Sequence, residues 1–173
     1  HMVKSNLSFS LIEIIVVIAI IAVVTSMGFA NFHRQQSDQQ LKAETRKMAD
    51  MISLARKKAS VSDTSPCVAG LITNDKIKKY EFLIKPSTKT YEVFPECATN
   101  ATPERITYTI QSNDILIITP AVESSIFFYP RLMTETTTMT VNIKNNVTNR
   151  CCQIDINAAG VIKEIPCAEC PAL

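Results

Sequence analysis

The sequence predicts an α+β protein in which one long N-terminal helix packs on an antiparallel β-sheet globular domain. Three observations lead to this fold class. Residues 14–32 contain no charged side chain, residues 41–59 repeat apolar side chains with the period of a helix, and the chain after Pro66 alternates with the period of a strand. The length of 173 residues fits one apolar helix and one globular domain of ordinary size.

The first expected element is an apolar helix over residues 9–32. A helix of about 20 apolar residues is roughly 30 Å long, which matches the hydrocarbon core of a bilayer. The sequence therefore predicts a transmembrane helix here. One carboxylate, Glu13, lies near the start of this run. Because a lone charge facing lipid is costly, we expect Glu13 to have a partner and a function.

The residues before this run, 1–8, are largely hydrophilic, include Lys4 and end at Ser8. A secretory signal peptide places its apolar region before the cleavage site, whereas here the apolar run follows Ser8. Cleavage after Ser8 would release residues 1–8 as a leader peptide and leave the helix on the protein.

Residues Ser8 to Val24 resemble the class III leader of type IV pilins and type II secretion pseudopilins. The resemblance implies that a prepilin peptidase cleaves between Ser8 and Phe9 and that Phe9 becomes an N-methylated terminus. Glu13 would then be the fifth mature residue, which this family uses to neutralise the terminal ammonium of a neighbouring subunit. The family usually has Gly where this chain has Ser8, a departure that bears on the efficiency of cleavage.

Elementary electrostatics supports the same role for Glu13. Opposite charges a few Å apart attract more strongly in a low dielectric than in water, and each offsets the desolvation of the other. A pair between subunits would also fix their stagger. The alternative is an ordinary membrane anchor with Glu13 at the level of the lipid headgroups.

An amphipathic helix over residues 33–60 is expected to continue into the globular domain. Its apolar side chains recur three, four or seven residues apart, which places them on one face that we expect to pack on a sheet. These side chains are Leu41, Met48, Ile52, Ala55 and Ala59. Ser, Asp and Pro cluster between Ser60 and Pro66 and predict the end of the helix.

A β-rich globular domain is expected over residues 66–173, where short runs rich in Thr, Ile and Val lie between turn residues. The candidate strands are Val68–Thr73, Lys78–Lys85, Thr90–Phe94, Arg105–Ile110, Ile115–Thr119, Ile126–Tyr129, Thr137–Ile143, Cys152–Ile156 and Val161–Ile165. This layout, together with residues Gln153 to Lys163, resembles the H-type minor pseudopilins and related minor pilins. The resemblance implies a minor subunit.

Six cysteines lie after the apolar run: Cys67, Cys97, Cys151, Cys152, Cys167 and Cys170. If this part of the chain is exported to an oxidising compartment, an even number of cysteines favours disulfides. A hairpin folded about Ala158 would bring Cys151 or Cys152 within bonding reach of Cys167 or Cys170, and Cys67 would pair with Cys97. A zinc site is the alternative for the four late cysteines, but adjacent strand residues point to opposite faces, so we expect no metal.

No catalytic set or cofactor site is expected. His33 lies at the end of the apolar helix, and Gly28, Gly70 and Gly160 are isolated, so a phosphate-binding loop is absent from the pattern. The formal net charge of +2 does not point to nucleic acid.

Two local basic groups, residues 56–58 and Lys76, Lys78 and Lys79, raise the alternative of DNA binding. Some DNA-binding relatives carry Gly-Arg-x-Arg near the C-terminus, where this chain has Gly160-Val161-Ile162-Lys163. This difference counts against DNA as a partner, and solvated helix and strand faces explain the basic groups.

These observations predict a structural, non-enzymatic minor subunit of a type IV pilus or type II secretion pseudopilus. The family implies three kinds of partner: other pilin or pseudopilin subunits, prepilin peptidase and an inner-membrane assembly platform. The chain would first cross the inner membrane once, with its globular domain in the periplasm, and then enter a periplasmic or extracellular filament. A DNA-binding minor pilin and a plain membrane-anchored periplasmic domain remain as alternatives.

Overall fold

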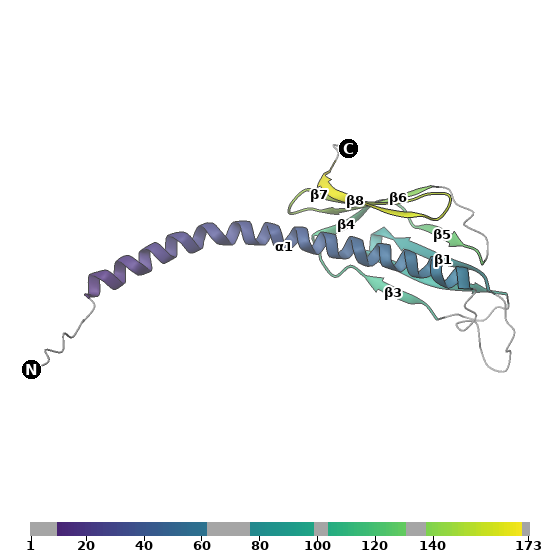
Figure 1. The fold of residues 1–173 in the computed structure, drawn as a ribbon, viewed down its shortest axis with the longest axis horizontal. Helices are drawn as coiled ribbons and strands as arrows, with labels where there is room; N and C mark the ends of the chain where they lie inside the picture. The colour runs from purple at the N-terminus through teal and green to yellow at the C-terminus, as the bar shows by residue number, and fades with distance from the viewer. Residues whose placement is uncertain (1–9, 62–76, 99–103, 131–137, 171–173) are drawn as a thin grey trace, which may run out of the picture. The chain divides into compact units, whose positions relative to one another are not determined.

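The computed structural model describes residues 10–61, 77–98, 104–130 and 138–170. The chain divides into two compact units, His1–Gln36 and Ser37–Leu173, which we call the N-terminal unit and the globular unit. Helix α1 (Leu11–Val61) contributes residues to both. Figure 1 shows the order of the elements, with α1 first and all described strands after it. The predicted α+β class is confirmed.

The globular half of α1 is amphipathic as the sequence predicts. The apolar side chains of its expected stripe are all buried, with exposed fractions of 3% or less: Leu41, Met48, Ile52, Ala55 and Ala59. Thr45 lies among them and is also buried, and its hydroxyl donates a 2.8 Å hydrogen bond to the Leu41 carbonyl. This bond replaces the hydration that the buried Thr45 hydroxyl would otherwise lose.

The described strands form two four-stranded antiparallel sheets. Sheet A has the order β3-β2-β1-β5, and sheet B has the order β4-β6-β7-β8. The bounds are β1 Ile77–Lys85, β2 Thr90–Cys97, β3 Ile106–Thr109, β4 Ile115–Thr119, β5 Ser124–Phe128, β6 Met139–Asn145, β7 Arg150–Ile156 and β8 Ile162–Glu169. A short 3₁₀ turn, Pro86–Thr88, joins β1 to β2. The expected strand Val68–Thr73 lies outside the described residues, and each other expected strand overlaps an observed one.

Two strands, β2 and β8, continue through a proline beyond the C-terminal ends that the sequence predicts. Strand β2 includes Pro95, but β3 pairs with β2 only as far as Val93. Strand β8 includes Pro166 and is an edge strand of sheet B. Proline has no backbone N–H, so a strand tolerates it where no neighbouring strand requires that donor.

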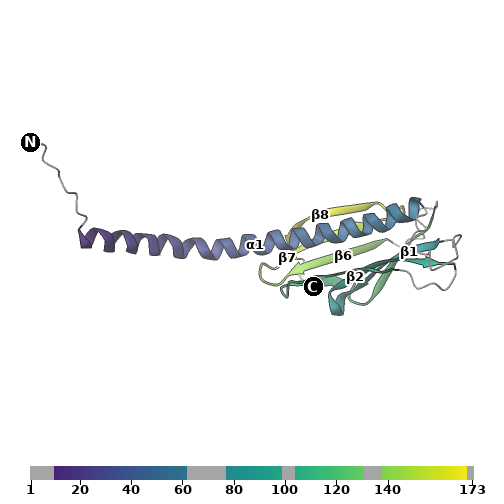
Figure 2. The same ribbon diagram turned by 90° about the horizontal axis from the view of Figure 1, so that it is seen from below.

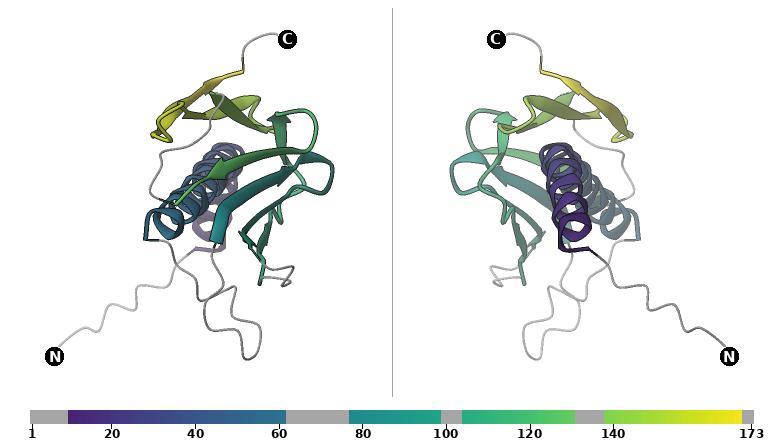
Figure 3. Two further views of the ribbon diagram at one scale, coloured as in Figure 1. Left: turned by 90° about the vertical axis from the view of Figure 1, so that its right-hand side faces the viewer. Right: turned by 90° about the vertical axis from the view of Figure 1, so that its left-hand side faces the viewer.

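One core joins α1 to both sheets. In the end-on views of Figure 3, sheets A and B cover different sides of the part of α1 that belongs to the globular unit. Aromatic rings form a row within this core, because the ring centroids of Phe82 and Tyr91 lie 5.9 Å apart and those of Tyr91 and Tyr108 lie 5.0 Å apart. Burial of such large side chains is the main favourable contribution to folding.

The C-terminal hairpin of β7 and β8 turns where the sequence places it. Gly160 has a φ of 68°, a left-handed conformation that glycine adopts without steric cost. The side-chain oxygen of Asn157 accepts hydrogen bonds from the backbone N–H groups of Ala159 and Val161. The turn therefore fixes the register of β8 against β7.

Two disulfides join the strands of this hairpin. Cys151 bonds to Cys170, and Cys152 bonds to Cys167, with Cα atoms 4.9 and 4.1 Å apart respectively. Each bond joins Cys151 or Cys152 to Cys167 or Cys170, as the predicted hairpin requires. Cys97 is also disulfide-bonded, whereas Cys67 lies outside the described residues.

Candidate assembly site on the N-terminal helix

Glu13 lies in the first turn of α1, where the carboxylate is favourably placed near the positive end of the helix dipole. The backbone N–H groups of Glu13 and Ile14 donate to the carbonyl of Ser10, which starts the helix. The Glu13 side chain is exposed, and within the described part of the chain no residue pairs with its carboxylate. The carboxylate is therefore available to a group supplied from outside these residues.

The predicted cleavage and methylation site, Ser8 and Phe9, lies immediately before the described residues. The cleavage between them therefore stays a prediction. Phe9 precedes Glu13 by four residues in the sequence.

The surface around Glu13 is apolar and exposed. Large aliphatic side chains from Leu11 to Val24 have exposed fractions between 50% and 76%. They are Leu11, Ile12, Ile14, Ile15, Val16, Val17, Ile18, Ile20, Ile21, Val23 and Val24. An apolar surface of this extent marks a site for another protein or for lipid. Glu13 is its one charged residue.

The predicted transmembrane helix was residues 9–32, of which the side chains of residues 26–31 are outside the description. Within the residues that are described, no helix is both long enough and apolar enough to cross a membrane.

The alternatives for the late cysteines and for His33 can be compared with the structure. The four thiols that a zinc site would need are instead joined in disulfides. In the described ranges, no three His, Cys, Asp or Glu side chains gather in a way that could hold a metal ion. His33 is exposed on α1.

Two lysines of one basic group share a single carboxylate. The ammonium groups of Lys78 and Lys79 lie 3.5 and 3.1 Å from the carboxylate of Glu96, and Lys79 also lies over the ring of Phe127 at 3.7 Å from its centroid. The hydrogen bond from Lys79 lowers the pKa of the Glu96 carboxyl below its ordinary value. Lys76 lies outside the described residues.

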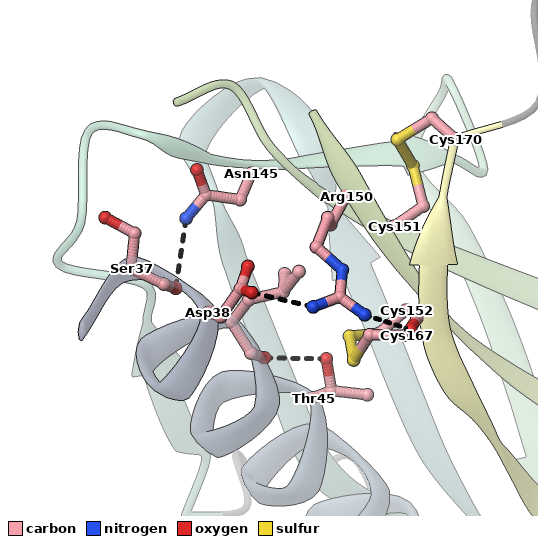
Figure 4. The surroundings of a disulfide bond; sticks show 10 residues. Ser37, Asp38, Thr45, Asn145, Arg150, Cys151, Cys152, Cys167 and Cys170 are labelled. Atoms are coloured by element: carbon pink, nitrogen blue, oxygen red, sulfur yellow. Dashed lines mark hydrogen bonds and ion pairs between the residues drawn. A yellow bond between two sulfur atoms is a disulfide. The ribbon is translucent and has the colours of Figure 1, made fainter. Parts of the chain in front are cut away.

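Sequence reasoning missed the polar residues that attach sheet B to the start of the globular unit. Arg150 on β7 donates to the Asp38 carboxylate at 2.7 Å and to the Cys167 carbonyl at 2.8 Å (Figure 4). Asn145, fully buried at the end of β6, donates to the Ser37 carbonyl at 3.1 Å. Such contacts join residues more than one hundred positions apart, and no local pattern in the sequence indicates them.

Comparison with protein families gives one match. Residues 4–29 match the family described as the prokaryotic N-terminal methylation motif. Comparison with curated proteins and with solved structures gives no significant match. The chain thus carries the class III N-terminal motif that is typical of type IV pilins and pseudopilins, and this motif includes Ser8, Phe9 and Glu13.

Proposed function

We propose that the chain is a structural minor subunit of a type IV pilus or a type II secretion pseudopilus. The observation that carries this proposal is the methylation motif over residues 4–29, together with a helix whose exposed apolar surface contains one carboxylate, Glu13, that pairs with no described residue. Prepilin peptidase cleaves the precursor between Ser8 and Phe9 and methylates the new terminus of Phe9. The protein has no catalytic activity of its own in this role.

In the assembled filament, Glu13 pairs with the terminal ammonium of a neighbouring subunit. The surrounding apolar side chains exclude water, so the attraction between the two charges is stronger than it would be in solution. Pairing also removes the cost of leaving either charge alone among apolar groups. The pair selects one axial stagger between neighbouring helices, while the apolar side chains supply the contact area.

Before assembly, the apolar helix over residues 9–32 holds the precursor in the inner membrane, with the globular unit in the periplasm. The disulfides of β7 and β8 support this location, because disulfides persist in oxidising compartments. The partners are other pilin or pseudopilin subunits, prepilin peptidase and the inner-membrane assembly platform. Glu96 compensates part of the charge of Lys78 and Lys79, which favours this role over DNA capture.

Substitution of Glu13 tests the assembly role. Glu13→Gln removes the charge and keeps the shape, so we expect the protein to remain in the inner membrane and to be lost from sheared filaments. Glu13→Asp keeps the charge and should retain part of the incorporation. Immunoblots of membrane and filament fractions from the native host measure both quantities.

Asp50→Asn is the matched control, because Asp50 is an exposed carboxylate on the same helix within the globular unit. This variant should enter filaments as the unmodified protein does. Incorporation of Glu13→Gln at the unmodified level would contradict the assembly role and favour a plain membrane anchor.

A further inference from the structure

An open groove runs between α1 and β8 in the globular unit. Its volume is about 670 Å³, and residues between Gln39 and Arg46 form one wall while residues between Glu164 and Cys167 form the other. Figure 2 shows β8 alongside this part of α1. The volume lies within the range of roughly 300–1,000 Å³ that is usual for ligand sites. The groove lies wholly within the globular unit and is separate from the apolar surface around Glu13.

The helix wall of the groove carries two cations. Lys42 and Arg46 are both exposed and, being four residues apart, lie on the same face of α1. The side chain of neither residue forms an ion pair or a hydrogen bond with any residue that the structure describes. Their neighbour Lys47 differs, because its ammonium binds both Glu44 and the Tyr108 hydroxyl. The opposite wall carries one exposed carboxylate, Glu164, so the two cations outnumber it and the lining of the groove has a net positive charge.

The opposite wall is the free edge of sheet B. Strand β8 pairs with β7 alone among the described strands. In an antiparallel pair, alternate residues direct their backbone groups towards the neighbour and away from it. Because Asn157 N–H donates to the Val161 carbonyl and the register continues through Lys163 and Ile165, the backbone groups of Ile162 and Glu164 point to the free edge.

The groove is held in shape before anything binds. The disulfide between Cys152 and Cys167 ties β8 to β7 at one end of the groove, and Arg150 binds the Cys167 carbonyl and Asp38 of α1. A preformed site loses less conformational entropy on binding than one that must first become ordered. Pro166 lacks a backbone donor, so it limits strand pairing to the residues before it.

We propose that this groove binds an extended acidic segment of a partner protein. The segment adds a strand to the edge of β8 at Ile162 and Glu164, and its carboxylates bind Lys42 and Arg46. An unpaired strand edge recognises an extended peptide through its backbone, and the flanking side chains set the specificity. This interaction uses residues of the globular unit only and does not depend on the proposed assembly role of Glu13.

The test uses the full-length protein in a non-ionic detergent and a fluorescent peptide of alternating valine and glutamate. We expect saturable binding by fluorescence anisotropy that weakens as salt increases. Reversing both helix charges, Lys42→Glu with Arg46→Glu, should weaken binding about tenfold, since it removes two exposed ion pairs and adds repulsion. Hydrogen–deuterium exchange should slow at residues 162–165 when the peptide binds.

Lys163→Glu is the matched control, because Lys163 is an exposed residue of the same edge strand that does not line the groove. Its affinity should change by less than about twofold. Equal binding of a peptide of alternating valine and lysine would overturn the proposal, as would unchanged affinity of the double variant or no binding at millimolar peptide. Protection of residues 162–165 by self-association of the protein alone would instead identify a second copy as the occupant.

Discussion

Arg150 joins parts of the globular unit that are distant in the sequence. Its guanidinium contacts Asp38 on α1 and the backbone of Cys167 on β8, so one side chain links the helix to the last two strands. The second oxygen of the Asp38 carboxylate, Oδ1, is buried and makes no hydrogen bond with a described residue. Among the described residues, Arg150 is therefore the group that compensates the negative charge of Asp38.

Arg150→Met should lower the free energy of unfolding by about 2 kcal/mol, because it leaves a partly buried carboxylate and a carbonyl without donors. Lys78→Met removes a more exposed ion pair with Glu96 and should cost at most about 1 kcal/mol. Thermal unfolding followed by near-UV circular dichroism measures both. If the two variants were equally stable, Arg150 would be an ordinary surface residue.

At the scale of elements, helix α1 was predictable and the pairing of the strands was not. The buried stripe from Leu41 to Ala59 repeats with the period of a helix, so its face and its end near Ser60 follow from local pattern. The alternation that indicates strands such as Ile115–Thr119 shows which side chains share a face. It does not specify a neighbouring strand, so the division into two sheets required the structure.

The two candidate sites, Glu13 and the groove, also differ in whether the sequence alone could identify them. The sequence alone identifies Glu13 as a candidate, because it is the one charge at the edge of a long apolar run. The groove was not predictable, because its walls come from residues near 42 and near 164, which only tertiary packing brings together. The sequence left two pairings open for Cys151 and Cys152, since either cysteine could face either later one.

The two disulfides of the hairpin should contribute unequally to stability. They close loops with sequence separations of 19 and 15 residues, for which chain entropy predicts similar contributions of about 3 kcal/mol each. Cys152 is fully buried, whereas Cys151 is partly exposed. Replacing Cys152 and Cys167 by alanine should therefore lower the melting temperature more than replacing Cys151 and Cys170, because it also removes packed core atoms.

Reductant should lower the melting temperature of the unmodified protein, and a chelator without reductant should leave it unchanged. Non-reducing peptide mapping identifies the linked cysteines directly. Free thiols at all four positions would contradict the disulfides and restore the zinc alternative.

At the scale of the whole molecule, the chain combines two units of different character. In its described residues, the N-terminal unit exposes apolar side chains and the carboxylate of Glu13, whereas the globular unit buries apolar side chains in a core of its own. The methylation motif, residues 4–29, lies entirely in the first. In the proposed role, the N-terminal unit makes the contacts between subunits, and the globular unit provides a separate surface for other contacts.

The mature N-terminus is the most direct test of this account. Protein purified from membranes and filaments of the native host should begin at Phe9, carry one methyl group on its terminal amine and lack residues 1–8. Intact-mass and fragment-ion mass spectrometry measure all three properties. A mature chain that retains Lys4 in a host with active prepilin peptidase would contradict the account.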